Sequence, residues 1–274
     1  MDTDLRCYLS PTGVAEEDND LTESFHEATK WSPSMSPVVD SRIILHLHDA
    51  RAVLEDSRNQ KRYANRPLEP LVKSDLRDPS IKRIETQRRS CRSFDGSRME
   101  APTVSAMLSA LRATRRAQSV VHPDALLHFR AYPSGGALYP VETYFALPTP
   151  DRSEWVLHHY APIEHAQTVL GRVPAAAMAA AMQDSQGLCD GAGMIVMLSA
   201  ILRRTMTKYG PTGYRFALIE AGAMVQQLVL TAADIGLGAL VWGSAYDDRA
   251  NRLFDLDGVD ETMLVSLFVG GAAE

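Results

Sequence analysis

The stretch from Phe216 to Ile235 constrains the fold more than any other part of the sequence. Its residues, FALIEAGAMVQQLVLTAADI, are rich in alanine and apolar nearly all round when placed on a helix. A helix of that kind needs neighbours on several sides. Four polar residues interrupt it and make it a poor membrane span: Glu220, Gln226, Gln227 and Asp234. We therefore expect a long buried helix, with Gly236 at its C-cap position.

Five segments have the composition of strands. Val141 to Leu147 and Glu154 to Tyr160 are rich in branched and aromatic residues, and the connector PTPDRS is typical of a turn, which predicts an antiparallel pair. Met194 to Leu198 is a continuous apolar run of the length of a buried strand. Leu240 to Trp242 and Met263 to Val269 are each followed by glycine and predict the last strands.

Two more helices are predicted. Apolar residues after Pro102 recur at the i, i+3, i+4, i+7 spacing of one helix face: Val104, Met107, Leu108 and Leu111. Pro102 suits a first helical turn, and either Thr103 or Asp95 would cap it. The alanine-rich run from Pro174 to Met182 is the second. Strands and helices mix without a regular βαβ alternation, which favours an α+β fold.

Domain organisation follows from where the prolines and charges lie. Residues 1–70 are charged and broken by prolines, which predicts a partly ordered N-terminal appendage, and residues 71–274 form the main domain. The segment from Leu71 to Ile84 has little periodicity, so we expect the linker there.

Composition excludes several functions. A net charge of −6 and a pI near 5.8 argue against a nucleic-acid binder, which needs a positive surface. Three widely spaced cysteines predict reduced thiols rather than disulfides or a zinc site: Cys7, Cys91 and Cys189. The start, MDTDLRCYLSPTG, has no basic region and apolar core of a signal peptide, so we expect a cytoplasmic protein with no membrane association.

An arginine cluster precedes the first predicted helix of the main domain. Arg88, Arg89, Ser90 and Arg92 place three guanidinium groups and a hydroxyl within five residues. Guanidinium groups match phosphate oxygens with paired hydrogen bonds, and serine can donate to a remaining oxygen. The cluster is a candidate phosphate site, although such a run is also typical of a solvated surface.

Three further segments are candidates for a ligand site. The loop Pro133-Ser134-Gly135-Gly136 leads into a strand, and its glycines leave room for a flat group, although a simple turn has the same composition. Lys208 and Tyr209 precede the long helix and could move a proton, or form a surface pair. A glycine-flanked strand could bring main chain close to a ligand: Gly238, Leu240, Trp242, Gly243 and Ser244. We assign no metal site and no hydrolase motif.

The order of these segments resembles one family. RRSCRSF, YPSGGALYPVETY, KYGPTGYRFALIEAG and GLGALVWGS, with a last strand ending in VGG, together resemble the SagB-type dehydrogenases of the nitroreductase superfamily, a branch that includes azoline oxidases. The resemblance runs from Gln87 to Gly271. The segment FHEATKWSP, from Phe25 to Pro33, is similar to the opening segment of many members.

The resemblance implies a nitroreductase-like α+β fold, with a mainly antiparallel central sheet flanked by helices, in an intertwined homodimer that holds FMN. It implies that the arginine cluster binds the cofactor phosphate, that the loop from Pro133 to Gly136 and the strand from Gly238 to Ser244 lie beside the flavin, and that Lys208 and Tyr209 are catalytic. One departure concerns the last strand. Members often carry a basic residue after its V-G, whereas here Gly271 follows, so phosphate binding rests more on the arginines.

The function that the resemblance implies is oxidation of a thiazoline or oxazoline to an azole in a peptide or carrier-bound substrate, with a cyclodehydratase as a possible partner. Two alternatives stay open at this stage. One is an NAD(P)H-dependent reductase of small molecules with a nitroreductase-like fold. The other is a non-catalytic subunit of a peptide-modifying complex.

Overall fold

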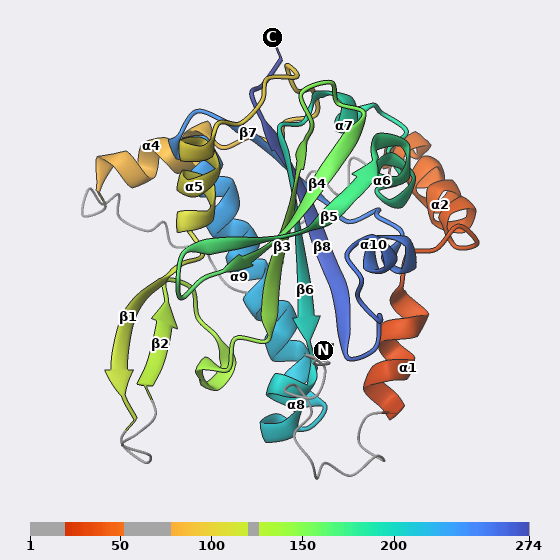
Figure 1. The fold of residues 1–274 in the computed structure, drawn as a ribbon. Helices are drawn as coiled ribbons and strands as arrows, with labels where there is room; N and C mark the ends of the chain where they lie inside the picture. The colour runs from red at the N-terminus through yellow and green to blue at the C-terminus, as the bar shows by residue number, and fades with distance from the viewer. Residues whose placement is uncertain (1–19, 52–77, 120–125, 274) are drawn as a thin grey trace, which may run out of the picture.

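A six-stranded sheet forms the centre of the protein (Figure 1). The computed structural model describes residues 20–51, 78–119 and 126–273. The strand order is β5-β4-β3-β6-β8-β7, and every neighbouring pair is antiparallel. The bounds are Val141–Pro148 for β3, Glu154–Ala161 for β4, Ala166–Pro174 for β5, Met194–Ile201 for β6, Gly238–Trp242 for β7 and Glu261–Gly270 for β8. The predicted α+β fold with a mainly antiparallel sheet is confirmed.

Side-chain alternation along the sheet builds two cores. In β3, Phe145 packs toward one face and Tyr144 toward the other, and in β6 Val196 and Met197 divide in the same way. All of β6 is buried, as the continuous apolar run predicted, because helices cover both of its faces. The first core contains α5 (Ala101–Ser109) and α9 (Thr212–Asp234). The second contains α6 (Ala175–Ala181), α7 (Leu188–Gly191) and α10 (Asp247–Leu253).

Helix α5 confirms the predicted apolar spacing but not the predicted cap. All four residues of the spacing pattern are buried, and Pro102 lies in the first turn. Glu100 is the N-cap residue, and its side chain makes no capping hydrogen bond. Asp95 instead accepts hydrogen bonds from the amide and hydroxyl of Ser97 in the preceding turn. The cap prediction was wrong because Asp95 lies too far before the helix to reach its first turn.

Helix α9 is long, as predicted, but in the single chain only one side of it is buried. Gly236 follows its last turn with a φ of 76°, which fits the C-cap prediction. Its length and composition would suffice to cross a membrane, yet its buried side packs on the sheet as a core helix does. Leu218 and Ile219, exposed by 42% and 65%, face away from the body. Those apolar side chains leave an uncovered surface on the helix.

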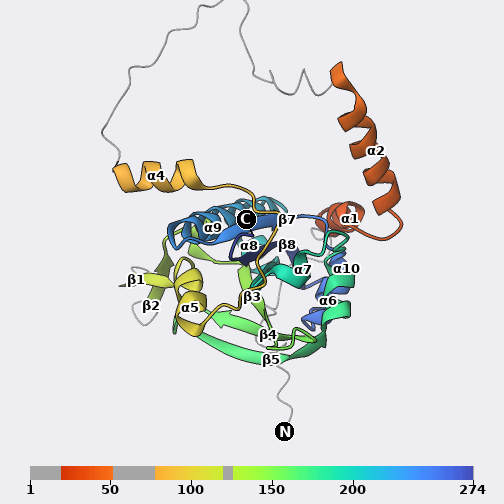
Figure 2. The same ribbon diagram turned by 90° about the horizontal axis from the view of Figure 1, so that it is seen from above.

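Several elements had no clear signal in the sequence. The edge strand β5 is mostly exposed, so its residues show no apolar alternation. A second sheet pairs β1 (Ala113–Gln118) with β2 (Leu126–Arg130). Within the expected linker lies α4 (Pro79–Gln87), whose first turn is capped by Asp78 through the amide of Ser80. Viewed from above, α4 projects from the body on the side of α9 (Figure 2).

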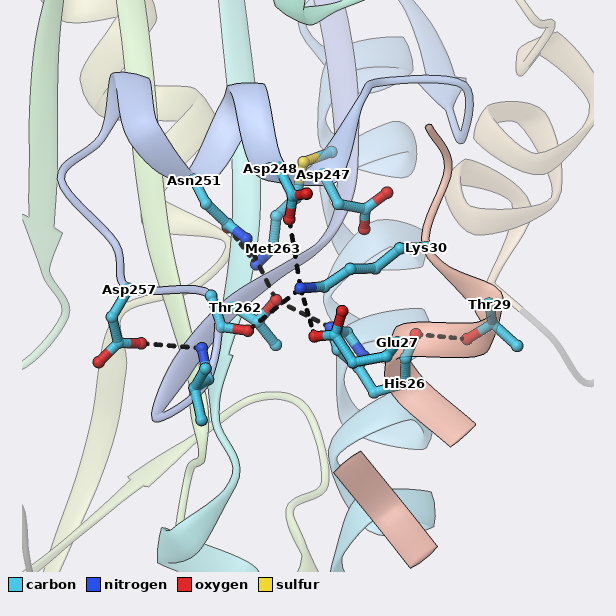
Figure 3. Close-up of polar contacts among 12 residues, drawn as sticks. His26, Glu27, Thr29, Lys30, Asp247, Asp248, Asn251, Asp257, Thr262 and Met263 are labelled. Atoms are coloured by element: carbon cyan, nitrogen blue, oxygen red, sulfur yellow. Dashed lines mark hydrogen bonds and ion pairs between the residues drawn. The ribbon is translucent and has the colours of Figure 1, made fainter. Parts of the chain in front are cut away.

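The described part of the N-terminal segment is helical and docks on the main domain. It forms α1 (Asp20–Thr29) and α2 (Ser36–His48). His26 of α1 is buried and lies between Tyr214 of α9, at 3.2 Å, and Thr262 of β8, at 2.9 Å. Lys30 forms an ion pair with Asp248 at 3.2 Å (Figure 3). The FHEATKWSP segment thus anchors α1 to α9, α10 and β8.

Candidate active site

The loop from Pro133 to Gly136 has an unusual main-chain conformation. It joins β2 to β3 through the short 3₁₀ turn η3 (Gly135–Ala137). Gly136, Ala137 and Tyr139 have φ values of 64°, 55° and 47°, a region that residues other than glycine seldom occupy. The Ser134 hydroxyl accepts a hydrogen bond from the amide of Tyr139 at 2.9 Å and so closes the loop. The first amides of such a turn have no partner inside it, which leaves them free for a ligand.

Lys208 and Tyr209 lie directly against this loop. They end α8 (Arg203–Tyr209), the short helix before α9. A β-carbon added to Gly136 would lie 2.5 Å from the Tyr209 hydroxyl oxygen and 3.0 Å from Lys208 Nζ. A side chain at position 136 would therefore require Tyr209 or Lys208 to shift. The structure brings together the loop and the Lys-Tyr pair, which are separated by about seventy residues of sequence.

The start of α9 supports the same loop. Phe216 lies where a β-carbon on Gly135 would come within 3.0 Å, and its ring packs edge-on against Tyr209 with centroids 5.0 Å apart. One turn further along, Glu220 is 1% exposed and accepts a hydrogen bond from the amide of Val141 at 3.3 Å. Burial raises the pKa of Glu220 to about 7, although hydrogen bonds from Ser134 and Val141 oppose this shift.

The arginine cluster lies against β7 instead. Ser90 forms a parallel bridge with Ala239, and the amide of Cys91 donates to the carbonyl of Ala239 at 3.0 Å. A β-carbon on Gly238 would lie 2.6 Å from the Cys91 sulfur, so glycine is needed there for the two chains to approach. The structure thereby joins two further predicted segments, the cluster and the glycine-flanked strand.

The arginines of the cluster differ in their contacts. Arg89 donates to the carbonyl oxygens of Thr86 and Arg88, at 2.6 and 3.0 Å, so that guanidinium is partly engaged. In residues 20–51, 78–119 and 126–273, neither Arg88 nor Arg92 has a carboxylate within ion-pair distance. Two unpaired guanidinium groups beside an exposed serine form a donor set suited to a phosphate.

Two residues of β7 point away from any ligand surface. Leu240 is 7% exposed and packs in the second core. Trp242 packs edge-on against Phe268 and donates through its indole N–H to the carbonyl of Met182 at 2.5 Å. These two could meet a ligand only through their main chain. Gly243 and Ser244 follow the strand, and a β-carbon on Gly243 would have no neighbour within 4 Å.

The predicted residues therefore form two groups at opposite ends of α9. The loop group comprises Pro133 to Gly136, Lys208 and Tyr209, near the start of the helix, and the arginine group comprises Arg88 to Arg92 and β7, near its end (Figure 1). A helix rises 1.5 Å per residue, so the helix between them spans about 30 Å. That distance exceeds the length of a flavin mononucleotide.

Comparison with known proteins places the chain in a family. The model of the nitroreductase family matches residues 86–271, which is most of the chain. The chain belongs to the nitroreductase family. The matched range contains both the loop group and the arginine group, and excludes α1, α2 and most of α4.

Individual relatives of this nitroreductase-family chain include the microcin B17-processing protein McbC of Escherichia coli. McbC is 30% identical over 153 residues, a match that covers 54% of this chain and 56% of McbC. The chain thus aligns with about half of the length of that relative. MJ1384 of Methanocaldococcus jannaschii is 24% identical over 182 residues, which is 66% of this chain and 87% of that protein.

Among solved structures, a chain of the E. coli microcin synthetase McbBCD complex, with truncated pro-MccB17 bound, has a similar fold. Its TM-score is 0.70, with 22% sequence identity, and the match covers 95% of each chain. This coverage extends the fold similarity beyond the residues that the family model matches, into the N-terminal segment.

Sequence reasoning missed several residues of this nitroreductase-family site. Phe216 and Glu220 were regarded only as parts of a buried helix, because nothing in the sequence indicates which side of α9 meets the loop. Arg203 and Arg204 precede Lys208 in α8, but their guanidinium groups are paired with other residues. Arg203 pairs with Asp260 at 2.8 Å, and Arg204 pairs with Glu142 and donates to the carbonyl of Tyr139.

Proposed function

We propose that this nitroreductase-family protein is an FMN-dependent dehydrogenase that oxidises a thiazoline or oxazoline to an azole in a peptide or carrier-bound substrate. The observation that carries the proposal is the close approach of Gly136 to Tyr209 and Lys208. It supports the proposal because these two side chains could exchange a proton with a substrate bound beside the loop. The similarity to McbC, whose name describes processing of a microcin, supports a peptide substrate.

The residues present fit FMN. Arg88, Arg92 and Ser90 would hold its phosphate, and the main-chain amides of Gly135 and Gly136 would lie beside its ring system. When bound, FMN accepts the two electrons of the oxidation as a hydride.

The chain itself would orient the substrate and move one proton. Conversion of an azoline to an azole removes one hydride and one proton, with no other atom lost. In this proposal Lys208 Nζ, or the Tyr209 hydroxyl, takes the ring proton as the C–H bond breaks. Phe216 and Gly136 restrict the position of the Tyr209 ring, so the acceptor atom is held beside the loop.

We further propose that two copies of the chain complete each site. The loop group and the arginine group are too far apart in one chain to hold one FMN, and α9 between them carries the uncovered Leu218 and Ile219. Pairing of two α9 helices would bury these side chains and bring the loop group of one chain to the arginine group of the other. A homodimer with two FMN molecules follows.

A cyclodehydratase is the partner that this reaction requires, because it forms the azoline ring that the dehydrogenase consumes. The fold similarity to a chain of the McbBCD synthetase complex supports such an assembly. The N-terminal helices α1 and α2 lie outside the matched family domain and would be available for that contact.

The first experiment is purification followed by mass spectrometry of azoline-containing peptides. We expect a yellow dimer with about one FMN per chain, and a loss of about 2 Da per ring oxidised. A colourless protein with no flavin released on denaturation would contradict the proposal and favour a non-catalytic subunit. Flavin-loaded protein that leaves every azoline peptide unchanged but turns over with NAD(P)H would favour a small-molecule reductase.

The second experiment tests the proton-transfer pair. Lys208→Ala should retain FMN and lose azoline oxidation by about 10²- to 10⁴-fold if Lys208 is the base. Tyr209→Phe removes only the hydroxyl and tests the alternative base. Flavin-loaded Lys208→Ala and Tyr209→Phe proteins that both work at the wild-type rate would remove the pair from the mechanism.

A further inference from the structure

Glu220 is the one acidic side chain of α9 that lies between that helix and the candidate loop. It is 1% exposed, and its Oε1 accepts a hydrogen bond from the amide of Val141, the first residue of β3. The Ser134 hydroxyl lies close enough to the same carboxyl group to oppose the rise of its pKa. Ser134 begins the loop and Val141 follows its end, so a single side chain contacts the loop at both of its ends.

The second carboxyl oxygen of Glu220 has an unusual environment. Oε2 is buried and has no hydrogen-bond partner among the residues that the structure describes. A buried polar atom without a partner lowers stability, because it gives up its hydrogen bond to water and gains none in the protein. Apolar residues fill the neighbouring inward positions of α9, Ala217 and Ala221, at no such cost. Packing alone would therefore favour an apolar residue at position 220.

The loop between the two contacts needs support. Ala137 and Tyr139 have positive φ values, a region in which the β-carbon of a non-glycine residue crowds its own main chain. Such a conformation persists only where surrounding contacts hold it. The Ser134 hydroxyl, which accepts from the amide of Tyr139, is itself held by Glu220.

We infer that Glu220 is a positioning residue that holds the loop from Ser134 to Val141 in its strained conformation, and through it sets the place of Gly136 against Tyr209. Glu220 does not touch the Lys-Tyr pair itself. Its effect passes from α9 through Ser134 and Val141 to the loop. The inference about the loop stands on the contacts of one chain, and only its consequence for FMN rests on the proposed function.

Hydrogen exchange of the FMN-free protein tests the loop directly. Glu220→Ala removes the carboxyl group, so we expect the bonded loop amides of Ala137, Leu138, Tyr139 and Val141 to lose protection by about tenfold or more, while those of β6 keep theirs. Glu220→Gln retains an acceptor for Val141 and a group that can bond Ser134, and it should keep loop protection within about threefold of wild type. Glu261→Gln is the control, a half-buried carboxyl of β8 that accepts hydrogen bonds from Ser199 and Tyr144 and forms none with the loop residues that the structure describes.

A second readout concerns the cofactor. We expect Glu220→Ala to raise the FMN dissociation constant by about tenfold or more, whereas Glu220→Gln and Glu261→Gln stay near the wild-type value. Loop protection in Glu220→Ala equal to wild type would overturn the inference, and so would an equal loss in Glu220→Ala and Glu220→Gln. If wild type binds no FMN but the loop responds as expected, the proposed function fails and the positioning role of Glu220 stands.

Discussion

Gly136 is the residue whose missing side chain matters most to the candidate site. Its φ of 64° and the nearby Tyr209 hydroxyl and Lys208 ammonium group leave no room for a β-carbon. The two side chains nearest this position, Lys208 and Tyr209, both come from the end of α8. Their roles as cofactor and catalytic residues remain predictions from the sequence.

Gly136→Ala tests this packing. The added β-carbon would push Tyr209 away or change the loop conformation, so FMN affinity and azoline oxidation should both fall by about tenfold or more, at a stability cost of about 1–2 kcal/mol. Flavin titration and thermal unfolding measure the two effects. Gly171→Ala is the control, because a β-carbon there has no neighbour within 4 Å. Normal flavin binding in Gly136→Ala would show that the loop does not face the cofactor.

The ionisation of Glu220 predicts how stability depends on pH. Burial raises its pKa from the ordinary 4.5 to about 7, so the folded state favours the neutral acid. The contribution of the neutral Glu220 side chain to the free energy of unfolding is fully present below pH 4.5 and is lost as the pH rises to about 7. The Glu220→Gln protein has no ionisable group at this position and does not lose this contribution. From pH 5 to pH 8 the free energy of unfolding of the wild type should therefore fall by about 2–3 kcal/mol relative to that of the variant. Denaturant unfolding at both pH values measures this change. A difference between variant and wild type that is the same at pH 5 and pH 8 would refute the prediction. The control is Glu154→Gln, which changes the glutamate of the surface ion pair with Arg172.

Among the elements, strands β6 and β5 differ most in how clearly their own residues predict a strand. The run from Met194 is readable as a strand because both faces are buried and every residue is apolar. Strand β5 is an edge strand with mostly exposed side chains, so its pairing with β4 is a property of the sheet rather than of its own residues. Helix α4 escaped prediction for a related reason, since none of its residues is buried in the single chain.

Helix α1 is held by polar contacts that can be tested one side chain at a time. Burial lowers the pKa of His26, so the folded state favours neutral imidazole between Tyr214 and Thr262. His26→Ala should release α1 and lower stability by about 1–3 kcal/mol. Limited proteolysis should then cut near residues 20–36 in His26→Ala but not in Glu23→Ala, which changes an exposed residue of the same helix. Equal resistance in both variants would show that other contacts, such as that of Lys30, suffice.

In the whole molecule, α2 and α4 project from the body on the side where α9 lies (Figure 2). Helix α9 exposes Leu218 and Ile219. The proposed dimer would cover this side. Leu218→Glu with Ile219→Glu places two charges in the proposed contact, and we expect a folded monomer without FMN. Light scattering and flavin content measure this, and Val169→Glu, on the exposed edge strand β5, is the control. A double variant that stays dimeric and yellow would exclude α9 as the contact.

Mixing two inactive variants tests whether each site is shared between chains. Arg88→Ala with Arg92→Ala should lose FMN, because each charge-assisted contact contributes about 1.5–3 kcal/mol. A hybrid dimer of this chain with a Gly136→Ala chain has one site with both defects and one with neither. We therefore expect about one FMN per hybrid dimer. Hybrids without flavin would show that both groups of a site come from one chain.

Elements whose own residues show a clear apolar pattern could be predicted from the sequence alone. The family could also be recognised from the sequence. Apolar periodicity indicated α5, and a long segment that is apolar nearly all round indicated α9. Apolar runs indicated the central strands, and the order of short motifs carried the resemblance. These signals are local, since each depends only on residues close together in the chain.

Which segments far apart in the sequence contact one another is known only from the fold. It placed Gly136 against Tyr209 and Lys208, put Glu220 beneath the loop, and separated the loop group from the arginine group by the length of α9. It also left Leu218 and Ile219 uncovered on a helix that the sequence predicted to be enclosed. Such contacts depend on how α8, α9 and the sheet pack together, and packing between distant segments leaves no periodic pattern in either of them.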